Sequence, residues 1–141
     1  MHLFRASTLV HGIGRLLPGA AFACLIGLPL GAQDASLVPA NRQELRAAPH
    51  DTARADALAR LCFNLINTDP DSARRYGEQA LALATRIGHP KAIADAHNNL
   101  GWLETQQGRV KAAEAHLLQA LDGFRRMGNP SYTSIALSNL G

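Results

Sequence analysis

Four histidines beyond residue 32 are the side chains best suited to proton transfer or metal binding, and they are scattered: His50, His89, His97 and His116. None of them pairs with a Ser or Cys in an arrangement typical of nucleophilic catalysis. His97 and Glu104 are seven residues apart and would share one face of a helix, but two ligands seldom make a metal site. No glycine-rich phosphate-binding motif is present either. The sequence therefore predicts no enzyme activity, no metal site and no cofactor.

Residues 1–32 have the pattern of a secretory signal peptide. Arg5 and Arg15 precede an uncharged apolar run over residues 16–32, and Leu30-Gly31-Ala32 is a candidate cleavage site. An uncleaved signal anchor is the alternative, although the run contains two prolines and is shorter than the ~20 residues of a spanning helix. We expect the protein to be exported, to the periplasm or the extracytoplasmic face of a bacterial membrane.

The cysteines predict no disulfide. A lipidated Cys24 would stand at the end of the apolar run, but apolar residues continue after it. Once residues 1–32 are removed, only Cys62 remains, and one cysteine cannot form an internal disulfide. Cys62 stands in a helical apolar pattern, so we expect a small buried side chain.

The charge of the chain gives no sign of a nucleic-acid partner. Removing residues 1–32, which hold Arg5 and Arg15 and no acidic residue, lowers the formal net charge from +3 to +1. Nucleic-acid binding requires a clustered basic face. The pairs Arg74-Arg75 and Arg125-Arg126 are isolated, and we expect both pairs to be solvated.

The part after residue 32 reads as a series of helices. Residues 33–50 predict a linker, irregular over 33–40, with a short helix over 41–48 that Pro49 ends. We expect Asp51 or Thr52 to cap the next helix. That helix carries an apolar stripe at Ala57, Leu58, Leu61, Cys62 and Leu65.

Local signals set the remaining helix ends. Asp69 is expected as an N-cap with Pro70 at the first helical position, and this helix should end at Ile87 before Gly88. His89 and Asn129 are expected to cap two further helices, over residues 90–106 and from Pro130 onward. Between them the pattern predicts a helix over residues 110–127. Connections of only 2–4 residues favour antiparallel neighbours.

A 40-residue recurrence organises these helices. The outline of residues 79–90 returns at residues 119–130, and Asn99-Leu100-Gly101 returns at residues 139–141. A period in this range is typical of a helical solenoid, whose units stack and present an extended binding surface.

The recurring unit resembles the tetratricopeptide repeat. In the best-matching unit the repeat-packing positions of that family fall on Leu100, Gly101, Gly108, Ala113, Leu117 and Ala120. His97 and Glu104 depart from the aromatic residues usual at their positions. The resemblance implies an all-α fold of antiparallel helical hairpins stacked as a right-handed solenoid over residues 51–141, in units 51–88, 90–128 and an incomplete 130–141.

The resemblance also implies a function. A signal segment before longer repeats is similar to the exported N-terminal sensory region of bacterial signalling proteins of the histidine kinase or transcriptional regulator type. The last hairpin stops at Gly141, so we expect a fragment of a longer protein; a stand-alone exported scaffold is the alternative. Membrane contact would come only from an uncleaved N-terminal segment or from a missing C-terminal part. The expected partner is a protein or peptide, or a second copy of the chain.

In the family the first helix of each hairpin lines a ligand groove. Carried over, the candidate residues are Asp95, Asn98, Trp102 and Thr105, with Asp56, Phe63 and Asn67 in the first unit and Ser138 in the last. Trp102 is either an exposed anchor for a peptide or a residue packed between hairpins. For Asn99 we favour a structural hydrogen bond between repeats. The family's Lys and Asn clamp for a C-terminal carboxylate is not carried over.

Overall fold

The computed structural model describes residues 35–141. They belong to a compact unit that spans Gln33–Gly141. The signal-peptide prediction for residues 1–32, and the alternatives of an anchor or a lipidated Cys24, lie outside the described residues.

Six α-helices and one short 3-10 helix make up the described part of the chain, which contains no strand. The prediction of an all-α fold is thus confirmed. The elements are η1 (Ala35–Leu37), α1 (Val38–Ala47), α2 (Asp51–Leu65), α3 (Pro70–Ile87), α4 (Pro90–Gln106), α5 (Val110–Arg126) and α6 (Pro130–Leu140).

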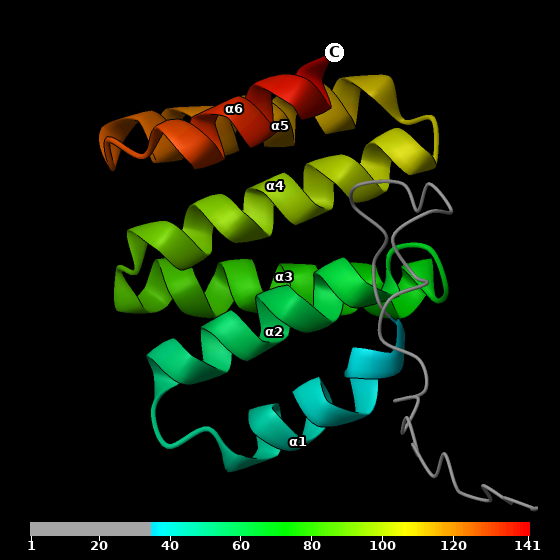
Figure 1. Ribbon diagram of the computed structural model, residues 1–141, viewed down its shortest axis with the longest axis vertical. Coiled ribbons are helices and arrows are strands. Elements are labelled where there is room, and N and C mark those ends of the chain that lie inside the picture. Colours follow the sequence, from blue (N-terminus) through cyan, green and yellow to red (C-terminus); the bar gives the residue numbers. More distant parts are fainter. Residues whose placement is uncertain (1–34) are drawn as a thin grey trace, which may run out of the picture. The chain divides into compact units, whose positions relative to one another are not determined.

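The helices are arranged as stacked hairpins. α2 packs against α3 and α4 against α5, while α6 starts the next pair by packing on α5. Neighbouring hairpins join because α4 also contacts α2 and α3, and α6 contacts α4. In Figure 1 the helices succeed one another from α1 to α6, with α2 in front of α3 and α6 in front of α5. This is the helical-hairpin repeat that the 40-residue recurrence predicted.

Polar side chains begin most of these helices as predicted. Asp69 accepts the backbone N–H of Ser72 at 3.0 Å, with Pro70 in the first turn of α3. His89 accepts the N–H of Ala92 through Nδ1 at 3.1 Å and so caps α4. Each cap satisfies one of the N–H groups that the first turn of a helix leaves unpaired. Asn129 caps α6 in the same way.

The cap of α2 is His50, so the expectation of Asp51 or Thr52 was wrong. Nδ1 of His50 accepts the backbone N–H of Ala53 at 3.2 Å, and the hydroxyl of Thr52 lies 2.6 Å from the same nitrogen. His50 has the extended backbone of a cap residue, whereas Asp51 is already helical. A neutral imidazole nitrogen can accept this bond as a carboxylate does, which allows the helix to start earlier.

The helix over residues 41–48 is longer than predicted, and the expected linker over 33–40 is in part helical. η1 and the first turn of α1 occupy residues 35–40, and Val38 is buried. Pro39 does not oppose this start, because the N–H that proline lacks has no partner in the first turn of a helix. α1 packs on α2 and therefore covers the first hairpin.

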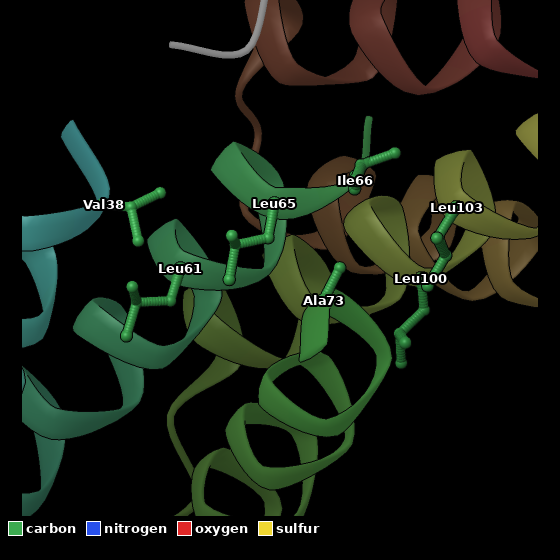
Figure 2. Packing of buried hydrophobic residues seen from close by; sticks show 7 residues of the cluster. All are labelled: Val38, Leu61, Leu65, Ile66, Ala73, Leu100 and Leu103. Atoms are coloured by element: carbon green, nitrogen blue, oxygen red, sulfur yellow. The ribbon is translucent and has the colours of Figure 1, made fainter. Parts of the chain in front are cut away.

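Apolar side chains from four helices form the core of the first hairpin. Figure 2 shows that the cluster joins α1, α2, α3 and α4, and the predicted stripe of α2 supplies a large share of the buried side chains. The seven residues of this cluster, which we call the main cluster, are Val38, Leu61, Leu65, Ile66, Ala73, Leu100 and Leu103.

Two glycines allow the helices to approach closely. A Cβ atom on Gly101 of α4 would lie 2.6 Å from Cγ of Leu117 on α5. A Cβ atom on Gly77 of α3 would lie 2.7 Å from Cδ2 of Leu100 on α4. Both distances are too short for real atoms, so the hairpin α4–α5 and the α3–α4 junction depend on a missing side chain.

None of the helices in residues 35–141 combines the length and the apolar character that crossing a membrane requires.

Candidate functional site

The predicted groove residues lie on the first helix of each hairpin or just after it. Asp56 and Asp95 are 39 residues apart, as are Phe63 and Trp102, and α2 and α4 also begin 39 residues apart. Each pair therefore occupies equivalent places in successive hairpins. Phe63, Asn67, Thr105 and Ser138 are exposed, whereas Asp56, Asp95, Asn98 and Trp102 are partly buried.

Trp102 packs on the core, which was one of the two predicted roles, and its role as an anchor stays a prediction. Its ring packs against the main cluster, which includes Leu100 and Leu103 of its own helix. Part of its surface remains exposed. The side chain is thus held by the core on one side and accessible to solvent on the other.

Asp95 is already paired. Nζ of Lys91 donates to Oδ2 of Asp95 at 2.6 Å and lies 5.6 Å from the centre of the Tyr132 ring on α6. Burial acts to lower the pKa of Lys91, but Asp95, with Tyr132 and Asp56, outweighs it and raises this pKa. The N-terminal part of α4 therefore presents a Lys91–Asp95 salt bridge and not a free carboxylate.

Asparagine side chains tie successive hairpins together. Nδ2 of Asn99 donates to the backbone carbonyl of Ala59 on α2 at 2.9 Å, which confirms the hypothesis of a structural bond. Asn139, its repeat on α6, donates to Oδ1 of Asn98 at 3.0 Å. Asn98 is the equivalent of Ala59, so both bonds end at the same place in the preceding hairpin. The Nδ2 group of Asn98 is the part of that amide that could donate to a ligand.

A hollow of 240 Å³ opens where α4 ends, α5 begins and α6 ends. Of the predicted groove residues only Thr105 lines it. Its lining mixes polar and apolar side chains: Thr105, Val110, Ala113, Glu114, Leu117, Asn139 and Leu140.

Two histidines that are distant in sequence meet between α4 and α5. Nδ1 of His97 lies 3.0 Å from Nδ1 of His116, and the ring centroids are 5.3 Å apart. The description of the histidines as scattered was therefore wrong for this pair, because the hairpin brings them together. Both rings are half-buried.

Glu104 on α4 is a buried carboxylate, only 3% exposed, with two arginine partners. Arg74 of α3 donates to its Oε1 and Arg109, just before α5, to its Oε2. Gln107 accepts from both arginines as well. The expectation that Arg74 is solvated was therefore wrong; burying a carboxylate requires a cation beside it.

Cys62 is fully buried on α2, as the sequence predicted. Burial raises the pKa of its thiol to about 12. The thiolate is the nucleophilic form of cysteine, so this side chain contributes volume to the core and no chemistry. Within residues 35–141 no group of three or more His, Cys, Asp or Glu side chains could hold a metal ion.

Comparison with known proteins agrees with this architecture. The family model described as tetratricopeptide repeat matches residues 51–126, which is more than half of the 141-residue chain. The chain belongs to the tetratricopeptide repeat family. No curated protein and no solved structure matches it.

The tetratricopeptide repeat pattern accounts for the packing of α4 on α5. The chain turns between these helices at Gly108, whose φ of 69° favours glycine. Gly101 lies against Leu117, as described above, and the small side chain of Ala120 is fully buried. Among the other residues predicted for this packing, Leu100, Ala113 and Leu117 are buried.

The departures from the tetratricopeptide repeat pattern mark what the sequence analysis missed. His97 and Glu104 stand where the family usually has aromatic residues, and each one belongs to a polar cluster. The partners His116 and Arg74 carried no signal of their own. A buried position that holds an ionisable residue was the signal that could have prompted a search for them.

Proposed function

We propose that this tetratricopeptide repeat protein is a protein-binding module that holds an extended peptide or a partner helix along the face formed by α2 and α4. Repeats of this family generally mediate protein–protein binding and are generally non-catalytic. The chain itself would then catalyse no reaction and would act through the partner that it holds.

A pair of partly exposed aromatic side chains carries the proposal. Phe63 on α2 is 38% exposed, and Trp102 occupies the equivalent place on α4. Because α2 packs directly on α4, these equivalent places belong to adjoining helices. Trp102 is packed against the main cluster, and such aromatic side chains are typical anchors of protein interfaces.

The polar neighbours suggest the chemistry of the ligand. The Nδ2 group of Asn98 is a donor that suits a carbonyl group of a peptide backbone. The ammonium group of Lys91 on α4 is bound to Asp95. We therefore expect a peptide with apolar or aromatic side chains and no preference for a free C-terminal carboxylate.

We further propose that the module is the exported sensory input part of a signal-transduction protein. The signal-peptide pattern of residues 1–32 and the resemblance to exported repeat regions support this role. Secretion of a reporter enzyme fused behind residues 1–32 tests the export step. A stand-alone exported scaffold remains the alternative.

Selection of peptides from a random library on the full chain tests the binding face. We expect selected peptides to lose about 10-fold or more in affinity for Trp102→Ala, the usual effect of removing an aromatic anchor. Trp102→Phe should retain most of the affinity. Leu118→Ala is the matched control, since Leu118 is an exposed apolar residue on α5.

Folding must be separated from binding in this experiment, because Trp102 also touches the main cluster. Circular dichroism gives the folded fraction of each variant. A binding titration corrected for that fraction gives the affinity per folded molecule. If that affinity is the same for Trp102→Ala and for the unmodified chain, the anchor proposal is wrong.

A further inference from the structure

The Nδ1 atoms of His97 and His116 form a hydrogen bond. Only one of these two nitrogens can carry a proton while the bond is intact. The centroid separation of 5.3 Å and the Nδ1–Nδ1 distance of 3.0 Å mean that each nitrogen points nearly straight at the other. One ring must donate and the other accept. When both rings are protonated, both nitrogens are donors and both rings are positive, so the contact becomes repulsive.

The surroundings of the pair favour its neutral form. Burial lowers the pKa of His97 below 6.5, and His116 lowers it further. Burial also lowers the pKa of His116; there Glu104 acts to raise it, Arg74 to lower it and Glu78 to raise it. The charged groups that face the pair therefore come from α3 (Arg74, Glu78) and α4 (Glu104).

The sign of the pH effect follows from these directions. A histidine whose pKa is lowered by folding binds protons less readily in the folded state than in the unfolded state. Its contribution to stability is complete above pH 6.5 and is lost as the pH falls below 6.5 through the lower folded value.

We propose that the His97–His116 contact is an acid-sensitive clasp, which joins α4 to α5 at neutral pH and opens when both rings are protonated. The contact sits at the centre of the hairpin α4–α5. His116 directly precedes Leu117, whose side chain lies against Gly101 on α4. Separation of the two rings therefore loosens a close contact between these helices.

Opening the clasp changes the proposed binding face. His97 directly precedes Asn98 on α4, and Trp102 lies little more than one turn further along the same helix. A shift of α4 against α5 moves both side chains relative to α2. The link to ligand binding rests on the proposed function, whereas the clasp itself does not.

Trp102 reports on the clasp without any ligand, because it is the single tryptophan of the chain. We expect its emission in the full chain to change as the pH is lowered from about 8 to about 5, the range in which histidine titrates. The melting temperature should fall by several degrees over the same range. In His116→Gln, whose amide cannot titrate, both changes should be clearly smaller than in the unmodified chain.

His89→Asn is the matched control. It removes a histidine at the start of the same helix, and asparagine keeps the cap that His89 provides to α4. A protonated imidazole nitrogen cannot accept the N–H of Ala92, so this variant separates the cap from the clasp, and it should keep the larger part of the pH dependence of the unmodified chain. His97→Gln repeats the test from the other side of the contact.

NMR titration of the histidine rings in the unmodified chain keeps the test independent of any variant that fails to fold. Two of the rings should titrate as a coupled pair at a pH below the ordinary 6.5 of histidine. The proposal is overturned if His116→Gln retains the full pH dependence, or if no coupled pair titrates. Since no ligand enters, failure of the clasp leaves the binding proposal standing.

Discussion

At the scale of single residues, Glu104 is a carboxylate held from two sides. It is almost completely buried on α4, and its two oxygens accept from arginines that belong to other parts of the chain. Transfer of a carboxylate from water to the interior is costly unless it is paired. α4 can therefore bury Glu104 only against parts of the chain that supply a cation.

Removal of Arg74 should destabilise the protein more than removal of a surface arginine. Arg74→Ala leaves the buried carboxylate of Glu104 with Arg109 alone, and we expect a loss of about 1–3 kcal/mol in the free energy of unfolding. Arg126 is the matched control: it pairs with Asp122 at 2.5 Å on α5, with 78% of its side chain exposed. Arg126→Ala should cost about 0–0.5 kcal/mol. Urea unfolding measures both.

A double variant identifies the source of the Arg74 effect. If the loss comes from an uncompensated charge, adding Glu104→Gln removes that charge, and the two losses should be far from additive. Additive losses, or equal effects of Arg74→Ala and Arg126→Ala, would show that the buried pairing contributes nothing beyond a surface contact.

At the scale of helices, close packing of α4 on α5 depends on Gly101. Its missing Cβ leaves room for the side chain of Leu117, which is itself buried. Gly101 is also one of the packing positions that the resemblance to the tetratricopeptide repeat predicted, and the structure places it in this contact.

Gly101→Ala should therefore destabilise the protein even though alanine favours helix formation. Helix propensity alone would make this change stabilising by about 1 kcal/mol, whereas overpacking costs about 1–3 kcal/mol. We expect a net loss, measured by thermal or urea unfolding. Leu117→Ala in the same chain provides the missing room, so the double variant should lose less than the sum of the two single changes. Net stabilisation by Gly101→Ala would contradict the close approach.

Helix ends and polar clusters differed in how well the sequence predicted them. Asp69-Pro70 and Gly88 act on the backbone within a few residues of themselves, so their roles could be predicted locally. The cap of α2 was missed because His50 competes with two better-known cap residues beside it. The bonds of Glu104 to Arg74 and of His97 to His116 join residues 30 and 19 positions apart. They require the register of whole helices, which no local pattern contains.

At the scale of the molecule, stability in a repeat protein is close to a sum over neighbouring units. α1 is the neighbour that covers the first hairpin, since Val38 joins the main cluster beside Leu61 and Leu65. This cover is imperfect: Asn41 on α1 is buried, and its Nδ2 atom has no hydrogen-bond partner in the described part of the chain. An unpaired buried donor reduces the gain from packing.

Deletion of α1 should lower stability without destroying the fold. We compare residues 33–141 with residues 49–141, which keep His50 as the cap of α2. Burial of a valine side chain contributes about 1.5–3 kcal/mol, and the hydrogen bonds and other contacts of α1 offset the cost of ordering its backbone, so we expect a net loss of about 1–3 kcal/mol in urea unfolding. Val38→Ala within residues 33–141 should reproduce about 1 kcal/mol of that loss. Equal stability of the two chains would mean that α1 rests on the hairpin without supporting it, whereas loss of all helical signal would mean that the hairpins cannot stand without it.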